Sequence, residues 1–456
     1  MMREMTLAQV EGALEAQLRG PDQRFSGVSS DSRKLAPGEL FVALQGPRFD
    51  AHDYLADVQA AGAVGAVVSR PVDAGLSQLV VADTRRALGL LGAHNRSFFA
   101  GPLVGITGSS GKTTAKNMIH SVLMQRGETL ATEANLNNEI GVPLTLLRIK
   151  PSTGFAVVEM GAGRPGDITW LCEIARPTIS LLLNAQAAHL ETFGKTVDDV
   201  AAAKGEIFDR LGADGVAVIN ADQPYAAQWR RRAGPADVLD FGLQQPAAIT
   251  ASSINVRGVD GVSFTASTPN GDIAIRLALP GRHNVANALA AIAVGLACGL
   301  KLTEIRDGLE GLRPVGGRLC SHVAPSGATV IDDCYNANPG SVRAAIDILA
   351  ACPGRRTLVL GAMLELGPDS ARMHREIGSY ARSAGIERLW GVGPELQPAV
   401  EEFGPAGRFF ADRAAWLSGD TEPPGPDDTL LVKGSRGAGM EQVLSALLAP
   451  VSAGEG

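Results

Sequence analysis

A glycine-rich turn between an apolar segment and a helical one constrains the fold more than any other feature of the chain. Residues 103–107, LVGIT, are apolar enough for a buried strand, and the turn begins directly after them at Gly108. The stretch at residues 112–125 then has a helical pattern. A strand, a glycine-rich loop and a helix in this order are typical of an α/β nucleotide-binding unit. The turn therefore predicts an α/β fold class.

The residues of this turn have the chemistry of a phosphate-binding loop. Glycines let backbone N–H groups approach phosphate oxygens closely, and the following helix points its positive end at them. We expect Lys112 on the β- and γ-phosphates and the Thr113 hydroxyl on Mg²⁺. The pattern G-x-x-x-x-G-K-[ST] is not met in full, because Ile106 stands five positions before Gly111. An alternative is a ligand-free turn, and the loop does not by itself separate a ligase from a kinase, a GTPase or a motor.

The chain divides into three regions by its pattern. Its 456 residues exceed what one core holds, so we predict domains at residues 1–83, 84–312 and 313–456. Residues 251–279 alternate with a period of two, and Asn270-Gly271 predicts a hairpin turn there. Strands and helices alternate in the third region, which predicts a doubly wound sheet. The predicted β segments are residues 38–46, 63–69, 103–107, 155–160, 179–184, 216–220, 329–333, 357–361, 388–393 and 429–434.

Composition excludes several classes of function. The formal net charge of −7 creates no field that attracts a polyanion, so nucleic acid is not expected as a partner. The five cysteines lack C-x-x-C spacing and indicate neither a disulfide framework nor a zinc site, which fits a reducing cytoplasm. No apolar run approaches the ~20 residues that span a bilayer, and the N-terminus lacks a signal-peptide core. We expect a soluble, cytoplasmic protein.

Three polar residues are candidates for metal binding and catalysis. Glu159 ends a predicted strand, where a carboxylate can hold Mg²⁺; the alternative is a solvated or N-capping glutamate. His189 follows the next predicted strand by five residues, and the alternative is a structural or solvent-facing histidine. Lys204 lies in a helical stretch of small residues. Partial burial would lower its pKa, so that the neutral amine could react with carbon dioxide; the alternative is an exposed lysine.

A second set of candidates lies farther along the chain. Asn284 and Asn287 share one helix face and could hydrogen-bond an adenine edge or a ribose. Helix capping by Asn284 is the alternative, and it would explain one asparagine but not both. Arg318, Asp333 and Lys433 begin the third region or end its strands, and none of them indicates a function by itself.

Together these motifs resemble the Mur ligase family over essentially the whole chain. One such string can arise by chance, but a dozen in the family's order indicate the family. Ala134 departs from the pattern, because family members often have glycine before the asparagine motif. The strings are SSDSRKLAPGELFVALQG, RFDAHDY, TGSSGKTT, NLNNEIGVP, VVEMGA, NAQAAHLETFG, AKGEIF, GRHNVANALAA, GGR, DDCYNANP, LGAMLELG and VKGSRG.

The resemblance implies a fold and an activity. It implies three α/β domains: a small domain for the substrate nucleotide, a central P-loop-type ATPase domain with a mostly parallel sheet, and a C-terminal Rossmann-like domain. The strings DDCYNANP, LGAMLELG and AKGEIF resemble members that join D-alanyl-D-alanine to UDP-N-acetylmuramoyl-tripeptide. This implies an ATP-dependent amide ligase with an acyl-phosphate intermediate, acting as a monomer in cytoplasmic peptidoglycan precursor synthesis.

At matching positions the resemblance also assigns roles to residues. ATP is expected on Gly108, Ser109, Ser110, Gly111, Lys112, Thr113, Thr114, Asn138, Asn284, Asn287, Arg318 and Asp333. Magnesium is expected on Thr113, Glu159, His189 and a carbamylated Lys204. The substrates are expected on Ser29, Ser30, Asp31, Ser32, Arg33, Gly46, Asp50, His52, Asn137, Tyr335, Asn338 and Lys433. The implied catalytic residues are Lys112, His189, Lys204 and Arg318.

Other functions are compatible with parts of the sequence. The nearest alternative is another amide ligase of the same superfamily, either a tripeptide-forming member or a folylpolyglutamate synthetase. A nucleotide-dependent switch or assembly protein is a second alternative, and it predicts slow ATP hydrolysis that no small amine accelerates. A noncatalytic binding module is the third, but phosphate-loop and metal-type residues occurring together argue against it.

Overall fold

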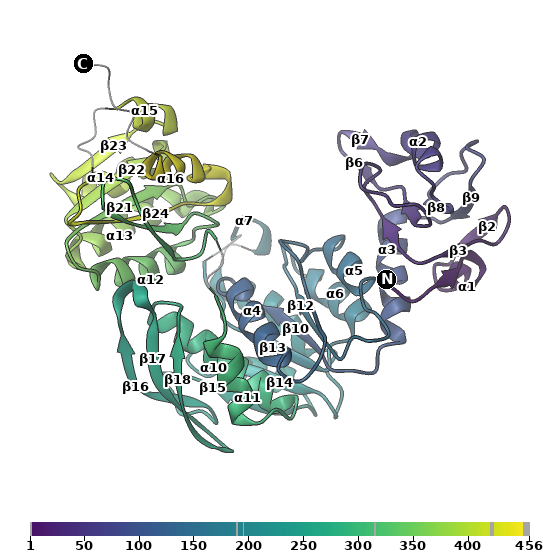
Figure 1. The fold of residues 1–456 in the computed structure, drawn as a ribbon, viewed down its shortest axis with the longest axis horizontal. Helices are drawn as coiled ribbons and strands as arrows, with labels where there is room; N and C mark the ends of the chain where they lie inside the picture. Colours follow the sequence, from purple (N-terminus) through teal and green to yellow (C-terminus); the bar gives the residue numbers. More distant parts are fainter. Residues whose placement is uncertain (1, 188–189, 195, 314–315, 420–423, 450–456) are drawn as a thin grey trace.

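The computed structural model describes residues 2–187, 190–194, 196–313, 316–419 and 424–449. Three sheet-containing regions follow one another, with the N-terminal and C-terminal regions at opposite ends and the central region between them (Figure 1). The predicted α/β class is confirmed, because each of these regions combines a largely parallel sheet with helices. Within the described ranges, no helix is long and apolar enough to cross a membrane.

The N-terminal region is built on a five-stranded sheet of order β2-β9-β8-β5-β4. Strands β4, β5, β8 and β9 are parallel, and β2 pairs antiparallel to β9 at one edge. A small hairpin, β6–β7, projects from this sheet. The elements are β1 (Met5–Thr6), α1 (Leu7–Glu11), β2 (Gln17–Arg19), β3 (Arg24–Phe25), β4 (Val28–Ser29), β5 (Leu40–Val42), β6 (Gln45–Gly46), β7 (Phe49–Asp50), η1 (Ala51–Tyr54), α2 (Leu55–Ala60), β8 (Gly65–Val68) and β9 (Ser77–Val80).

The central region contains a six-stranded parallel sheet of order β11-β12-β10-β13-β14-β15. All five residues of β10 are buried, because helices cover both faces of a parallel sheet. Leu103 packs into the apolar core on one face, and Val104 and Ile106 pack into the core on the other. The elements are α3 (Thr84–Ser97), β10 (Leu103–Thr107), α4 (Lys112–Leu123), β11 (Thr129–Ala131), α5 (Gly141–Leu146), β12 (Phe155–Glu159), α6 (Asp167–Ala175), β13 (Ile179–Leu182), α7 (Leu190–Phe193), α8 (Val197–Gly205), η2 (Glu206–Phe208), β14 (Val216–Asn220), α9 (Ala226–Arg232) and β15 (Asp237–Phe241).

A three-stranded antiparallel sheet, β16-β17-β18, follows the parallel one. The hairpin predicted at Asn270-Gly271 is confirmed between β17 and β18, although Gly271 is already the first paired residue and faces Thr268. Its backbone has φ of +112°, which glycine adopts without a steric penalty. The elements are β16 (Thr250–Val256), η3 (Gly258–Asp260), β17 (Val262–Thr268), β18 (Gly271–Leu277), α10 (Arg282–Ala297) and α11 (Leu302–Glu310).

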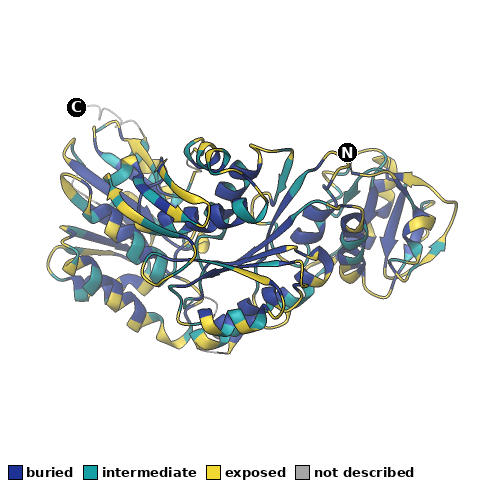
Figure 2. Cartoon of the chain, turned by 90° about the horizontal axis from the view of Figure 1, so that it is seen from below, coloured by how far each residue is buried: buried dark blue, intermediate teal, exposed yellow. Residues whose placement is uncertain are grey.

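The C-terminal region has a six-stranded sheet of order β19-β20-β24-β21-β22-β23. All neighbours pair in parallel except β19, which is an antiparallel edge strand. The four interior strands of this sheet are largely buried and the outer helix faces are exposed (Figure 2). The elements are β19 (Cys320–Val323), β20 (Thr329–Asp333), α12 (Pro339–Ala350), β21 (Arg355–Gly361), η4 (Gly367–Asp369), α13 (Ser370–Ser383), β22 (Arg388–Val392), η5 (Pro394–Leu396), α14 (Gln397–Phe403), β23 (Gly407–Phe410), α15 (Arg413–Ser418), β24 (Asp428–Lys433), η6 (Arg436–Ala438) and α16 (Glu441–Leu448).

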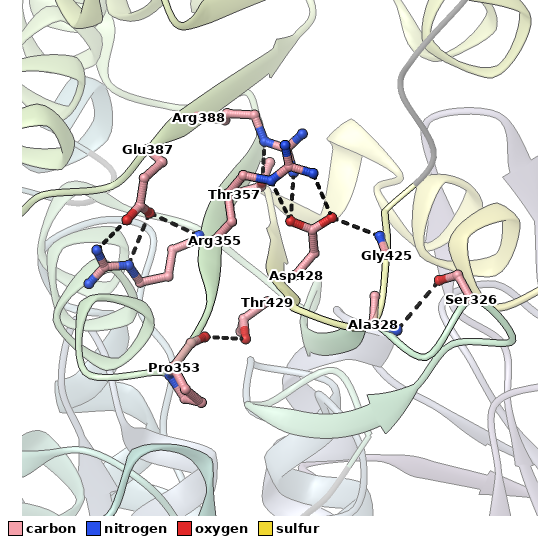
Figure 3. Close-up of polar contacts among 11 residues, drawn as sticks. Ser326, Ala328, Pro353, Arg355, Thr357, Glu387, Arg388, Gly425, Asp428 and Thr429 are labelled. Carbon is pink, nitrogen blue, oxygen red and sulfur yellow. Dashed lines mark hydrogen bonds and ion pairs between the residues drawn. The ribbon is translucent and has the colours of Figure 1, made fainter.

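An ion cluster joins the amino ends of three strands in this sheet (Figure 3). The carboxylate of Asp428, which begins β24, accepts two hydrogen bonds from Arg355 at 2.7 and 3.0 Å. Arg388, which begins β22, donates to the same carboxylate at 3.1 Å and to Thr357 Oγ1 at 2.9 Å. Arg355 is the first residue of β21. The cluster therefore fixes the order of strands β24, β21 and β22 at the edge opposite their carboxyl ends.

Helix α3 lies where we predict the first domain boundary. It begins at Thr84, and the Asp83 side chain caps it by accepting hydrogen bonds from the backbone N–H groups of Arg85 and Arg86. The helix packs against α5 and α6 of the central region. This packing associates α3 with the parallel sheet of that region. The boundaries after residues 83 and 312 stay predictions.

Candidate active site

A cavity of about 760 Å³ lies between the central and C-terminal regions. Its walls are the loop after β10, the starts of α4 and α10, and the carboxyl ends of β12, β20 and β24. Of the predicted site residues, those that line it are Gly108, Ser109, Ser110, Gly111, Lys112, Thr113, Thr114, Asn137, Asn138, Glu159, Lys204, Asn284, Asn287, Arg318, Asp333, Tyr335, Asn338 and Lys433. The predicted residues of the N-terminal region do not line it, and His189 lies outside the described residues.

The glycine-rich loop is shaped by its glycines and by one lysine contact. Gly111 has φ of +80°, and a Cβ atom there would lie 2.9 Å from Asn287 Oδ1. Glycine is therefore required both by the backbone conformation and by the close approach of α10. Lys112 Nζ donates to Gly108 O across the loop at 2.7 Å. Burial lowers the pKa of Lys112; Glu159 opposes this shift, and Arg318 adds to it.

Two residues that the sequence reasoning missed hold the loop in place. Asn184 Oδ1 accepts a hydrogen bond from the Ser110 N–H at 3.0 Å. Gln186 Oε1 accepts from the Ser110 hydroxyl at 2.9 Å, and the Gln186 N–H donates to Ser109 Oγ at 2.9 Å. Both residues follow β13, which pairs with β10. The sequence signal that could have identified them is their position just after a predicted buried strand. The carboxyl ends of neighbouring parallel strands lie at the same edge of a sheet, so residues that follow such strands lie near one another.

Glu159 and Thr113 place two oxygen ligands side by side. The Thr113 hydroxyl donates to Glu159 Oε2 at 3.0 Å, and Asn137 Nδ2 donates to Glu159 Oε1 at 2.9 Å. Glu159 is 3% exposed at the end of β12, so the alternative of a solvated or N-capping glutamate is wrong. A carboxylate beside a hydroxyl suits Mg²⁺, which keeps waters and phosphate oxygens as its other ligands. Among the residues with described positions, no three His, Cys, Asp or Glu side chains gather as a metal site.

Lys204 is enclosed rather than solvent-exposed. It lies near the end of α8 with 2% exposure, and its Nζ atom is 5.5 Å from the centroid of the Phe193 ring. The alternative of an exposed helix lysine is therefore wrong. Burial, reinforced by the nearby charge of Lys112, lowers the pKa of Lys204 to about 7. A substantial fraction of this side chain is a neutral amine at physiological pH, which is the nucleophilic form.

The start of α10 presents two buried asparagines to the cavity. Asn284 Nδ2 donates to Pro280 O at 2.8 Å, and Asn287 Nδ2 donates to Asn284 Oδ1 at 3.1 Å. The N-cap residue is Gly281, so the alternative that Asn284 caps the helix is wrong. Asn138 lines the cavity near the start of α5, where its Oδ1 accepts from the N–H of Gly141 at 2.9 Å.

The C-terminal region contributes charge at the ends of β20 and β24. Arg318 Nη2 donates to Thr113 Oγ1 at 3.0 Å, which joins this region to the phosphate loop. Lys433 Nζ lies 2.5 Å from Asp333 Oδ2 and 2.8 Å from Asn336 O. Burial raises the pKa of Asp333, and its ion pair with Lys433 opposes that shift. Asn338 caps α12, since its side chain accepts from the Ser341 N–H at 2.9 Å.

The predicted residues of the N-terminal region form two polar turns. In the first, which carries Ser29, Ser30 and Ser32, hydrogen bonding from Arg33 lowers the pKa of Asp31 to about 2. In the second, after the hairpin that carries Gly46, His52 is 2% exposed. Its Nδ1 atom lies 2.5 Å from Asp50 Oδ1, and its Nε2 atom accepts from the Ser69 N–H at 2.9 Å. Both ring nitrogens are thus engaged, so His52 supports the turn and leaves Asp50 nearer the surface.

The asparagine motif contains a strained residue. Ala134 has φ of +47°, in the left-handed region that favours glycine. It precedes Asn137, whose side chain donates to Glu159 at 2.9 Å. The departure from glycine noted in the sequence therefore falls where the backbone needs glycine's freedom, and the loop keeps its shape despite the alanine.

Comparisons with known proteins agree along the whole chain. Residues 106–295 match the Mur ligase middle domain, and residues 317–436 match the Mur ligase, glutamate ligase domain. The UDP-N-acetylmuramoyl-tripeptide–D-alanyl-D-alanine ligase of Escherichia coli K12 is 44% identical over 449 residues, 98% of this chain and 99% of that protein. A crystal structure of MurF from Acinetobacter baumannii superposes with a TM-score of 0.93 at 35% identity, covering 98% and 99% of the two chains. MurF ligase from Thermotoga maritima in complex with ADP superposes with a TM-score of 0.82 at 27% identity, covering 93% and 97%.

Proposed function

This chain belongs to the Mur ligase family, and from that premise we propose that it joins D-alanyl-D-alanine to UDP-N-acetylmuramoyl-tripeptide with conversion of ATP to ADP and phosphate. One observation in the structure carries the ATP-dependent part of the proposal. Lys112, Thr113 and Glu159 of the central region meet Arg318 of the C-terminal region in one cavity. The relative from Thermotoga maritima, which is similar over most of the chain, is in complex with ADP.

The proposed chemistry has two steps. A carboxylate oxygen of the tripeptide attacks the γ-phosphorus, the bond from that phosphorus to the β–γ bridging oxygen breaks, and ADP leaves. The nitrogen of D-alanyl-D-alanine, as free amine, then attacks the acyl carbon and loses a proton. A C–N bond forms and inorganic phosphate departs. Activation is needed because a carboxylate carbon shielded by negative charge does not react with an amine at neutral pH.

The chain's own residues supply positive charge where the two anions meet. Lys112 at the start of α4 and Arg318 on Thr113 are placed to offset the repulsion between carboxylate and triphosphate. Their charge also stabilises the oxyanion that forms when the amine attacks. Closure of the C-terminal region over the site would exclude water, which hydrolyses an acyl phosphate.

Magnesium fits the oxygen atoms at the end of β12. Glu159 and Thr113 would hold it, with His189 as a further proposed ligand. Mg²⁺, when bound, supplies charge that neutralises the phosphates. Asn137 keeps the Glu159 carboxylate oriented through its 2.9 Å hydrogen bond. We propose that adenine and its surroundings are contacted by Asn138, Asn284 and Asn287, and that Asp333 contacts ATP.

A carbamate on Lys204 is a further part of the proposal. The buried amine, with its pKa near 7, would react with carbon dioxide to give an anion that helps position a metal. Lys204→Ala should then lose activity and regain part of it with short-chain carboxylates such as acetate. Intact-mass measurement in bicarbonate should show an added carboxylate on the wild type and not on the variant. An absence of both rescue and added mass would remove the carbamate from the mechanism.

The N-terminal region is proposed to hold the uridine diphosphate sugar. The polar turns at residues 29–33 and 46–52 support this, because they present backbone and side-chain hydrogen-bonding groups on the far side of the molecule from the C-terminal region (Figure 1). Tyr335, Asn338 and Lys433 are proposed for the substrates near the C-terminal region. In the part of the chain that the structure describes, no disulfide joins any of the five cysteines, which supports the proposed cytoplasmic location.

One assay tests the proposed function. The full-length protein is incubated with ATP, Mg²⁺, UDP-N-acetylmuramoyl-tripeptide and D-alanyl-D-alanine, and the product is weighed by mass spectrometry. We expect the mass of the nucleotide plus the dipeptide less one water, with one ADP and one phosphate for each product. A preference for a free amino acid or for glutamate as the acceptor would indicate that the protein has the activity of another ligase of the superfamily. Slow ATP hydrolysis that no amine accelerates would refute the ligase itself.

A further inference from the structure

Arg318 reaches the phosphate loop from the C-terminal region, and its own loop is firmly tied. Its Nη2 atom donates to Thr113 Oγ1 at 3.0 Å. The preceding residue, Gly317, donates its N–H to Asp332 Oδ2 at 2.7 Å. Leu319, which follows, is buried and has φ of +56°. The backbone on both sides of Arg318 is therefore held in one conformation.

The side chain of Arg318 rests on an aromatic ring. Its guanidinium carbon lies 4.0 Å from the centroid of the Tyr335 ring, close for a cation–π contact. The Tyr335 N–H also donates to Gly317 O at 3.1 Å. A second guanidinium, that of Arg436, lies 6.0 Å from this ring, but its side chain is 72% exposed and pairs with Glu441. Of the two arginines, the one that contacts Thr113 is the one that lies close to the ring.

We propose that Tyr335 is a positioning residue that holds the Arg318 guanidinium for the terminal phosphate of ATP. The inference rests on the proposed function, in which Arg318 meets that phosphate. An arginine side chain loses rotamer freedom when it binds a fixed group. A ring that already restricts the guanidinium reduces this loss, so binding and phosphoryl transfer are both favoured. A contact of this type corresponds to about 3- to 30-fold in affinity.

Apart from the substrate contact proposed above, which the experiment leaves out, the ring has one competing role toward the nucleotide: Tyr335 lines the cavity and could stack on the base. The two roles depend on different parts of the ligand. A ring that acts through Arg318 matters when a terminal phosphate is present. A ring stacked on adenine matters equally for ADP and for ATP. Comparing nucleotides with and without the γ-phosphate therefore separates them.

The experiment measures binding of ADP and of the β,γ-imido analogue of ATP to the full-length protein by calorimetry, with Mg²⁺ present. The proteins are the wild type, Tyr335→Leu, Tyr335→Phe, Arg318→Ala and the double variant Tyr335→Leu/Arg318→Ala. We expect Tyr335→Leu to weaken binding of the analogue about 3- to 30-fold more than it weakens binding of ADP. Tyr335→Phe, which keeps the ring, should restore most of that loss. The double variant should bind the analogue no worse than Arg318→Ala alone.

A matched control comes from the same region. Arg343 lies 5.1 Å from the Tyr380 ring, and neither residue lines the cavity. Tyr380→Leu should change thermal stability and leave both nucleotide affinities unchanged. If Tyr335→Leu does not fold, Tyr335→Met takes its place, because a flexible side chain fills the space without a ring.

Two results would overturn the inference. One is an equal loss of ADP and analogue binding in Tyr335→Leu, which indicates stacking on the base. The other is a loss that multiplies in the double variant, which indicates that the two residues act independently. Binding requires no amine acceptor, so failure to ligate D-alanyl-D-alanine would sink the proposed function and leave this measurement interpretable.

Discussion

Charge is used in opposite ways at the two ends of the strands in the C-terminal sheet. We call the side where its parallel strands begin the amino edge and the side where they end the carboxyl edge. At the amino edge, Asp428 is 3% exposed in its side chain and sits between two guanidinium groups (Figure 3). The hydrogen bonds from Arg355 lower the pKa of Asp428, and the charge of Arg388 adds to this effect. The two guanidinium groups thus stabilise the ionised carboxylate of Asp428. This cluster contributes to the stability of the sheet and lies away from the cavity.

The carboxyl edge faces a cluster of like charges. Lys433 pairs with Asp333, but Arg318 lies near the phosphate loop with Lys112, and Lys112 lies near Lys204. The charge of Arg318 lowers the pKa of Lys112, and the charge of Lys112 lowers the pKa of Lys204. These cations disfavour one another, which is expected of groups arranged to receive a polyanion. Charge at the amino edge therefore serves the fold, and charge at the carboxyl edge serves the ligand.

The largest effect should come from removing a cation at the carboxyl edge. Lys112→Ala should lower kcat/KM by about 10²- to 10³-fold, since one preorganised charge on the reacting phosphates is lost. Thermal stability should be unchanged or slightly higher, because a buried like charge is also removed. Steady-state kinetics and thermal melting check both parts. Near-wild-type turnover would break the assignment of this edge to the ligand.

The matching change at the amino edge should act on stability instead. Asp428→Ala removes the buried carboxylate to which Arg388, 14% exposed in its side chain, donates. We expect the free energy of unfolding to fall by about 3 kcal/mol, with KM for ATP unchanged at a temperature where the protein stays folded. Denaturant unfolding and the ligation assay test this. A large rise in KM would show that the two edges are not separate in function.

Burial of the Lys204 side chain should make the free energy of unfolding depend on pH. Its pKa is lowered to about 7 in the folded chain, whereas an unfolded lysine titrates near ~10.4. Between these values the unfolded chain binds more protons, so this residue makes stability rise with pH across that window. Lys204→Met should remove the rise and stabilise the neutral protein by on the order of 1–3 kcal/mol. Unfolding at several pH values, in buffers purged of carbon dioxide, measures it; identical slopes in both proteins would contradict it.

The smallest effect should come from an exposed pair at the amino edge. Glu387 accepts hydrogen bonds from Arg356, and its side chain is 40% exposed. Glu387→Gln should change the free energy of unfolding by about 0.5 kcal/mol. Denaturant unfolding of Glu387→Gln and Asp428→Ala, measured in parallel, tests whether the loss of unfolding free energy depends on burial or only on the presence of an ion pair. A loss as large as that of Asp428→Ala would show that burial is not the deciding factor.

In the two six-stranded sheets the interior strands were predicted and the edge strands were not, whereas β9, which is interior to the N-terminal sheet, was missed. Strands β10, β12, β13 and β14 are continuous apolar runs, because each has a neighbour on both sides and helices on both faces. The edge strands β11 and β15 of the central sheet and β19 and β23 of the C-terminal sheet were missed. Their residues, TLA, DVLDF, CSHV and GRFF, are short or mix polar and apolar side chains. An edge strand has one pairing partner and partial solvent contact, so its sequence carries a weaker periodic signal.

The candidate site divides in the same way. The glycine-rich loop, Glu159 and Lys204 were predicted from local pattern and from the family resemblance. Asn184 and Gln186 were missed, although they hold Ser109 and Ser110. The contact between Arg318 and Thr113 joins residues that are 205 positions apart in the sequence. A local sequence pattern cannot predict a contact between residues so far apart.

Local sequence was enough to predict the interior strands of the two six-stranded sheets, the start of the phosphate loop, and the family that the chain resembles. These properties depend on residues close together in the chain, so periodicity and short motifs express them. The packing of the folded chain was needed to show that Lys204 is buried, that Glu159 lies beside Thr113, and that Arg318 rests on Tyr335. Burial and charge proximity arise from the packing of distant segments, and they set the pKa values and orientations on which the chemistry depends.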